Sequence, residues 1–82
     1  MMESEQLKQI IEQGMTVTHI EVDGDGQHFQ AVIVSPEFEG KPMLAQHRLV
    51  KAVLKSRFDS GELHALSMRT LTPEQWVAGQ QG

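Results

Sequence analysis

The strongest constraint on the fold is a pair of apolar-rich segments separated by a short turn sequence. Residues 17–22 alternate loosely between apolar and polar side chains, and residues 28–34 form a β-rich run with Phe29, Ala31 and Ile33 on one side. The sequence between them is rich in residues that favour tight turns, namely Asp23-Gly24-Asp25-Gly26. The sequence therefore predicts an antiparallel β-hairpin in the first half of the chain.

Short helical signals lie on both sides of this hairpin. At 3–13 the apolar residues share one helical face, and Gly14 follows as a stop signal. After the hairpin, Ser35 and Pro36 match the capping position and the first position of a helix. Gly40 soon interrupts that pattern, so we expect only one or two helical turns there.

A longer amphipathic helix is predicted at 43–58, directly after Pro42. Its apolar residues share a broad face made of Met43, Leu49, Val50, Val53 and Leu54. Three cations form a stripe beside this face, namely Arg48, Lys51 and Lys55. No acidic residue occurs from 40 to 58, whereas eight of the eleven acids lie at or before Glu39. The stripe is either a solvated helix face or a site for an anionic partner.

A third strand is predicted at 63–68, and a capping box opens a short final helix at Thr72-Pro73-Glu74-Gln75. The connection between the second and third strands is long and helical, so the third strand should run parallel to the second. The predicted fold class is α+β, in the order α-β-β-α-α-β with a short C-terminal helix. We expect a single domain over 1–82, with a three-stranded mixed sheet and helices on one face.

Composition excludes several functions. The chain of 82 residues has no cysteine, so it offers no disulfide, no thiol nucleophile and no cysteine-ligated metal site of its own. A net charge of −4 argues against generic nucleic-acid binding. The acidic, polar start does not resemble a secretory signal, and no apolar run reaches the roughly 20 residues of a membrane span. We therefore expect a soluble, cytoplasmic protein.

No motif predicts catalysis. The three serines of the second half lack a nucleophile-elbow context, and Glu37 and Glu39 flank a turn where we expect them to be solvated. A calcium loop beginning at Asp23 would need glycine and glutamate where His28 and Val34 stand. We interpret the chain as a binding module and not as an enzyme.

The four histidines are not spaced as a local metal motif. His28 and His64 each begin a predicted strand, so both are either ordinary strand-end residues or ligands that converge in the fold. His47 lies between the apolar face and the basic stripe of the predicted helix, which is typical of a half-buried histidine. His19 falls on the polar phase of its strand, and we expect it at the surface.

Several segments together resemble the BolA family, and the short loop before His28 resembles its YrbA/IbaG-type branch. The resemblance covers about residues 5–78 and is carried by Gly24-Asp25-Gly26-Gln27-His28-Phe29, Val34-Ser35-Pro36-Glu37-Phe38-Glu39-Gly40-Lys41-Pro42, Gln46-His47-Arg48-Leu49-Val50, Leu63-His64-Ala65-Leu66-Ser67 and Leu71-Thr72-Pro73-Glu74-Gln75-Trp76. It implies a class II KH-like fold, which agrees with the predicted order of elements.

The resemblance also implies a partner and a cofactor. In this family a monothiol glutaredoxin with bound glutathione shares a bridging two-iron two-sulfur cluster, and the isolated chain would bind none. The family's histidine at the start of the third strand matches His64. The family's second ligand is a cysteine or histidine in the loop between the first two strands. Asp25 stands at the matching position here, and His28 is the nearest imidazole. The sequence leaves open which of them supplies the second ligand. An imidazole ligand raises the cluster potential and titrates near neutrality.

Some family members are described as DNA-binding regulators of stress or morphology genes, which gives an alternative function. The candidate surface for DNA or a protein partner is Lys41, His47, Arg48, Lys51 and Lys55. The turn before the helix, Gly40-Lys41-Pro42-Met43, lacks the second glycine of a GXXG loop. A third reading is an adaptor whose basic helix docks on an acidic protein surface without metal.

Overall fold

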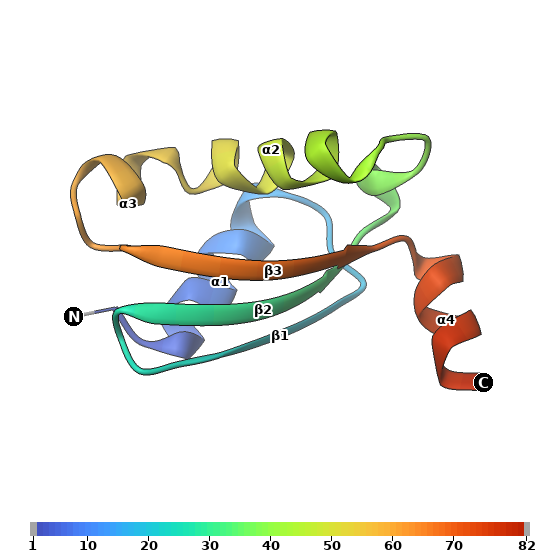
Figure 1. Cartoon of the computed structure of the whole chain (residues 1–82), viewed down its shortest axis with the longest axis horizontal. Coiled ribbons are helices and arrows are strands. Elements are labelled where there is room, and N and C mark those ends of the chain that lie inside the picture. Colours follow the sequence, from blue (N-terminus) through green and yellow to red (C-terminus); the bar gives the residue numbers. More distant parts are fainter. Residues whose placement is uncertain (1, 82) are drawn as a thin grey trace.

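The computed structural model describes residues 2–81 and consists of one sheet, four α-helices and a 3-10 turn (Figure 1). In chain order the elements are α1 (Ser4–Gly14), β1 (His19–Gly24), β2 (His28–Val34), η1 (Pro36–Phe38), α2 (Met43–Val53), α3 (Lys55–Asp59), β3 (Ala65–Leu71) and α4 (Pro73–Gln81). The strand order is β1-β2-β3, with β1 antiparallel and β3 parallel to β2. The predicted α+β class, hairpin and mixed sheet are therefore confirmed.

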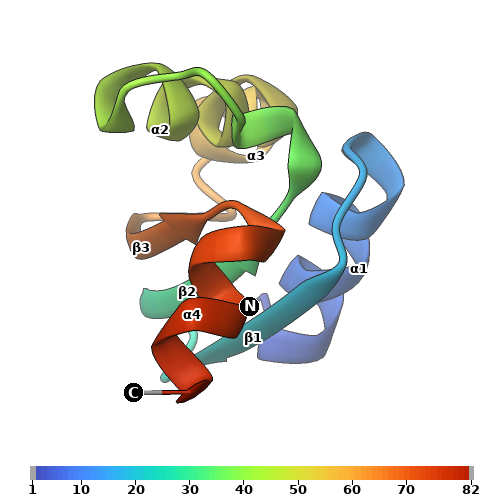
Figure 2. The same cartoon turned by 90° about the vertical axis from the view of Figure 1, so that its right-hand side faces the viewer.

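Three helices cover one face of the sheet. Figure 2 shows α1, α2 and α3 on the same side, while α4 lies across the end where β3 finishes. The core forms between this face and the helices, and its fully buried residues include Phe29, Ile33, Leu7, Ile11, Val50 and Leu54. Each such side chain stabilises the fold by about 1.5–3 kcal/mol through removal of its surface from water. The opposite face of the sheet is left without a helix over most of its length.

Gly14 does more than end the first helix. A Cβ atom at this position would overlap Val53 of α2, so the missing side chain lets the two helices approach closely. The same absence of a Cβ matters at Gly24, where the added atom would lie 2.5 Å from the backbone oxygen of His28. Close packing therefore explains why a residue without a side chain stands at both positions.

The predicted caps are confirmed in detail. The Ser35 side chain accepts a hydrogen bond from the Glu37 amide at 3.0 Å, with proline at the next position. Thr72 accepts from the Gln75 amide at 3.2 Å, and the Gln75 side chain accepts from the Thr72 amide at 2.9 Å. Glu37 is exposed, as predicted, and its Oε2 also accepts a hydrogen bond from the Thr16 amide at 2.6 Å.

The predicted helix at 43–58 is wrong in one respect, because it is two helices. Leu54 adopts φ −100° and ψ 7°, which interrupts the helix between α2 and α3. The Leu54 side chain at this break is completely buried. Met43 was placed on the apolar face, yet 68% of it is exposed, because the first turn of α2 projects beyond the core.

The strand boundaries also shift. The first strand lies at His19–Gly24 instead of 17–22, and the third at Ala65–Leu71 instead of 63–68. In both cases the register with β2 decides the boundary, since Gly24 pairs with Phe29 and Leu71 pairs with Val34. None of the helices within residues 2–81 combines the length and the apolar character needed to cross a bilayer.

Candidate functional site

The starts of β2 and β3 lie side by side at one end of the sheet. The parallel register pairs His28 with Ala65, and the Ala65 amide donates to the Gln27 carbonyl at 3.2 Å. His64 immediately precedes β3 and is exposed. The topology therefore brings His64 to the hairpin loop, although 35 residues of sequence lie between it and His28. In Figure 1 this end lies on the left, near the N-terminus.

A hollow of about 460 Å³ opens beside His64. Its lining comes from three parts of the chain that meet only in the fold, with the residues Met2, Gln6, Gly26, Gln27, Gly61, Glu62 and His64. Two of these residues belong to the start of the chain and to α1, so the hollow lies on the helix-covered side of the sheet. The imidazole of His64 thus faces an open, largely polar space that another molecule can enter.

Asp25 shapes the hairpin loop. Its Oδ1 accepts hydrogen bonds from the Gln27 amide at 2.9 Å and the His28 amide at 2.8 Å. These two backbone hydrogen bonds, that of His28 first, lower the pKa of the Asp25 carboxyl below its usual 3.8. The carboxylate is therefore ionised at neutral pH and serves as an acceptor that closes the turn.

His28 is largely exposed to solvent at the start of β2. About 73% of its side chain is exposed, and its Nδ1 lies 3.9 Å from Oδ2 of Asp25. Along the pleated strand it follows the phase of exposed Gln30, whereas Phe29 points into the core. The structure places the two predicted imidazoles at neighbouring strand starts without bringing them into one cluster. No group of three or more metal-binding side chains assembles anywhere in residues 2–81.

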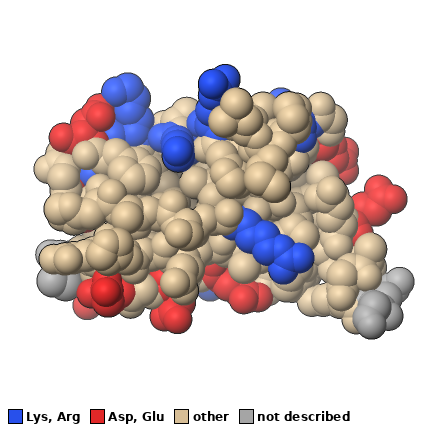
Figure 3. Space-filling view, viewed as in Figure 1, with Lys and Arg blue, Asp and Glu red and all other residues tan. Residues whose placement is uncertain are grey.

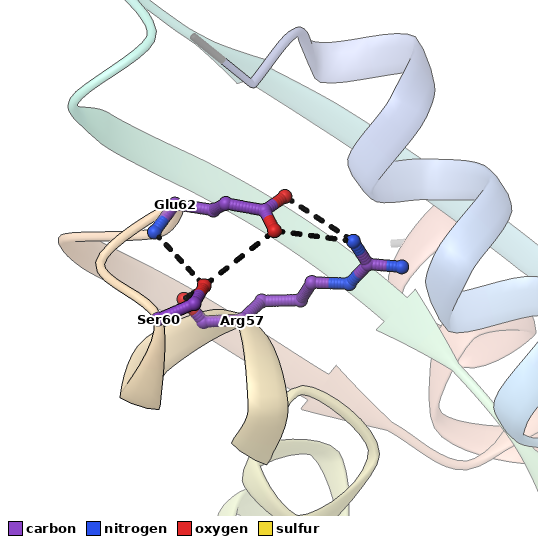
Figure 4. A network of polar contacts seen from close by, with 3 residues as sticks. All are labelled: Arg57, Ser60 and Glu62. Carbon is purple, nitrogen blue, oxygen red and sulfur yellow. Dashed lines mark hydrogen bonds and ion pairs between the residues drawn. The ribbon is translucent and has the colours of Figure 1, made fainter.

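A small polar network fixes the segment that leads to His64 (Figure 4). Arg57 contacts the Glu62 carboxylate at 3.2 Å, and Ser60 Oγ accepts from the Glu62 amide at 3.3 Å. The Leu63 amide donates to the Arg57 carbonyl at 3.1 Å, and the Leu63 side chain is buried in the core. Sequence reasoning missed these contacts; the turn signal Ser60-Gly61 was the only hint of them. Together they hold His64 at the surface while its neighbour is anchored.

The predicted basic surface lies elsewhere, along α2 and α3. Figure 3 shows blue side chains gathered over these helices at the upper edge and red ones near β1 at the lower edge. Lys55 is bound to Asp59 at 2.7 Å, and His47 is half-buried, as predicted. The other three cations are exposed, and among residues 2–81 none of the ion pairs involves Lys41, Arg48 or Lys51.

His19 is not a plain surface residue. Its ring stacks on Trp76 of α4 with centroids 4.5 Å apart and planes at 19°. Its Nε2 lies 2.6 Å from the Glu21 carboxylate. The sequence expectation of an exposed His19 is correct only in part, because α4 folds back onto the end of the sheet. This histidine helps to dock α4 and lies away from the His64 hollow.

The chain is a small α+β domain whose exposed His64 lies next to a glycine-rich hairpin at one end of the sheet. Residues 3–75 match the model of the BolA family, described as BolA-like protein, and the chain belongs to this family.

Relatives and solved structures agree with that assignment. Human BolA-like protein 2 is 35% identical over 95% of this chain and 94% of its own length. The acid stress protein IbaG of Escherichia coli K12 is 27% identical, covering 93% of this chain and 90% of its own. The structure of a bolA protein homologue from Coxiella burnetii has a TM-score of 0.81 at 42% identity, covering 94% and 99% of the two chains. Yeast Fra2 has a TM-score of 0.76 at 35% identity, covering 92% and 84%.

Proposed function

We propose that this BolA-like chain is an adaptor that binds a monothiol glutaredoxin and shares with it a bridging two-iron two-sulfur cluster, in cluster trafficking or iron homeostasis. The observation that carries the proposal is the position of His64. Its imidazole is exposed beside the hairpin loop and borders an open hollow. We assign the chain a binding role without a catalytic step of its own.

The possible metal ligands near His64 fit a cluster shared with a partner better than a cluster bound by this chain alone. The chain has no cysteine, so the thiolates of the cluster would come from the glutaredoxin and its glutathione. His64 would supply an imidazole to one iron. A neutral imidazole in place of a thiolate raises the potential of a cluster and makes the iron easier to release near neutral pH.

Between the two candidates for a second ligand, the contacts favour His28. Asp25 already uses Oδ1 for two backbone amides, and its removal from the turn would cost those hydrogen bonds. The His28 ring has only a 3.9 Å approach to Asp25 and is largely exposed, so it can turn toward a partner without breaking the loop. A nitrogen ligand also suits iron in such clusters better than a hard carboxylate does.

A spectroscopic titration tests this function. Monothiol glutaredoxin loaded with its cluster and glutathione is titrated with the full chain while visible absorbance and circular dichroism are recorded. We expect a new spectrum that saturates at one chain per cluster, and its absence with His64→Ala. His47→Ala, the same change on α2, is the matched control and should behave as the unaltered chain. An unchanged spectrum with the native chain, or a full response with His64→Ala, would contradict the proposal.

The same titration separates the two candidates for the second ligand. His28→Ala should shift or weaken the new spectrum, whereas Asp25→Asn should leave it intact, because the amide oxygen of asparagine still accepts the two backbone hydrogen bonds. The reverse result would assign the second position to Asp25.

DNA binding by the segment 43–58 is supported less. Its single favourable observation is the set of exposed, unpaired cations Lys41, Arg48 and Lys51 within an acid-free stretch. Three phosphate contacts would give a salt slope of about −3 in a plot of log affinity against log salt. A flat salt response at low ionic strength, or no loss with Arg48→Ala, would exclude it. The acid-stress name of one bacterial relative supports a role in the stress response for either function.

A further inference from the structure

Two large apolar side chains are exposed next to one another at the start of α2. Met43 is 68% exposed and Leu44 is 62% exposed, although nearly all other large apolar residues in the described chain pack in or against the core. The remaining large exposed apolar residue is Val77 on α4, near the C-terminus. Adjacent exposed apolar groups on a rigid helix mark a contact surface more often than scattered ones do.

Cations surround this apolar pair. Leu44, Arg48 and Lys51 are spaced i, i+4 and i+7, so they form one stripe on the solvent side of α2. Lys41 precedes the helix and is also exposed. No carboxylate occurs within the segment 40–58, and in residues 2–81 none pairs with these three cations. We call Lys41, Met43, Leu44, Arg48 and Lys51 the α2 outer surface.

The α2 outer surface is held in place by a buried side chain. Gln46 Nε2 donates to the Lys41 carbonyl at 2.8 Å, and Gln46 Oε1 accepts from the Thr70 hydroxyl at 2.6 Å. Gln46 is itself buried, so these hydrogen bonds tie the turn before α2 to the helix and to β3. A surface that is ordered before binding loses less entropy when a partner docks.

We propose that the α2 outer surface docks an acidic amphipathic segment of a partner protein, with apolar side chains that cover Met43 and Leu44 and carboxylates that meet the three cations. The charge and the apolar pair together select this occupant. DNA would neutralise the cations but leave the two apolar side chains without a contact, and the chain's net charge of −4 opposes a polyanion. A protein segment satisfies both parts of the surface.

This site is separate from the His64 hollow. The first turn of α2 and the loop that carries His64 lie at opposite ends of the row formed by α2 and α3, along the longest axis of the molecule (Figure 1). The proposal therefore does not rest on the proposed function. A glutaredoxin bound at the His64 end of the sheet would leave the α2 outer surface accessible, so one chain can bind two partners.

The test uses the isotope-labelled full chain and a synthetic acidic amphipathic peptide as a probe. The peptide has roughly 15 residues, about four helical turns, with leucines at helical spacing between glutamates. Nuclear magnetic resonance should show shifts concentrated at Lys41–Lys51. The double variant Met43→Ser/Leu44→Ser should weaken binding about tenfold or more, because it removes the apolar contact. Arg48→Glu should weaken it severalfold.

Matched variants and probes decide the outcome. Val77→Ser removes an exposed apolar group from α4 and should leave the affinity for the peptide unchanged. Arg69→Glu makes the same charge change as Arg48→Glu but on β3, and it should also leave the affinity unchanged. A peptide of the same composition with shuffled leucines should bind more weakly. The proposal is overturned by no shift up to about 1 mM peptide, by equal binding of the double variant, or by a DNA duplex that shifts the same residues when the peptide does not. Unchanged thermal unfolding of each variant shows that it remains folded.

Discussion

The two ends of this molecule offer different chemistry and are built in different ways. At the end of the sheet where β2 and β3 begin, a largely polar hollow lies beside the exposed imidazole of His64. Parallel pairing of β2 with β3 brings His64 to the hairpin loop there. At the start of α2, helical spacing aligns Leu44 with the cations Arg48 and Lys51. The first end suits a ligand bond to a metal centre, and the second suits desolvation and charge pairing. On our two proposals, the first site would depend on the topology of the sheet and the second on one helix and the turn before it.

The largest expected difference is between two leucines, one near each end. Leu63→Ala should lower the free energy of unfolding by about 2–5 kcal/mol, because Leu63 is buried next to His64. Leu44→Ala should change it by no more than about 0.5 kcal/mol, because Leu44 is exposed on α2. Urea unfolding measures both. Equal destabilisation by the two variants would contradict the difference between a buried Leu63 and an exposed Leu44.

Gln46→Ala should weaken peptide binding at the α2 outer surface more than cluster binding at the His64 end of the sheet. The change removes the hydrogen bonds to Lys41 and Thr70, which should cost about 1–3 kcal/mol of stability. The affinity for the acidic peptide should fall with it, whereas the cluster spectrum formed with glutaredoxin should be retained. Calorimetry of both complexes checks this, and parallel loss of both would show that the two ends are coupled.

Arg57→Ala should increase the mobility of the segment 60–64 before β3, with a smaller effect on the free energy of unfolding. Its pair with Glu62 is partly exposed, so we expect a loss of at most about 1 kcal/mol. Amide hydrogen exchange should nevertheless accelerate at 60–64, since the network holds the approach to His64. Lys55→Ala breaks the comparable exposed pair with Asp59 and is the control. Faster exchange at 60–64 in the control as well would remove the special role of Arg57.

The smallest expected effect concerns pH and the hairpin loop. Backbone hydrogen bonds hold the pKa of Asp25 below 3.8, so the folded form favours the carboxylate. The stabilisation is present above pH 3.8 and is lost as the pH falls through the still lower folded pKa. Asp25→Asn should flatten the pH dependence of the urea midpoint in that acid range and leave it unchanged near neutrality. An identical acid profile for both chains would show that these hydrogen bonds do not favour ionisation.

Local signals in the sequence explain most of the fold. The turn residues, the β-rich run at 28–34 and the capping box at Thr72 each act over a few residues, and each is confirmed. The break at Leu54 could not be predicted, because the apolar face continues through Leu54 and the segment 50–58 contains neither glycine nor proline. The exposure of Met43 was missed for a similar reason: a helical wheel does not show where the core ends.

The candidate site was only partly accessible from sequence. Strand-start positions pointed to His28 and His64, but only the register of His28 with Ala65 shows that they are neighbours at one end of the sheet. The contacts of Arg57, Glu62 and Leu63 follow from a loop whose path no short motif predicts. Those contacts explain why His64 is presented to solvent.

The most direct measurement of the central claim is magnetic coupling between this chain's histidine nitrogen and the cluster. The chain is labelled with an isotope in histidine only, mixed with unlabelled cluster-loaded glutaredoxin and reduced, and pulsed electron paramagnetic resonance is recorded. We predict a coupling from a directly bound labelled nitrogen that His64→Ala removes and His47→Ala retains. No coupling from the labelled chain, or a coupling that survives His64→Ala unchanged, would contradict the role assigned to His64.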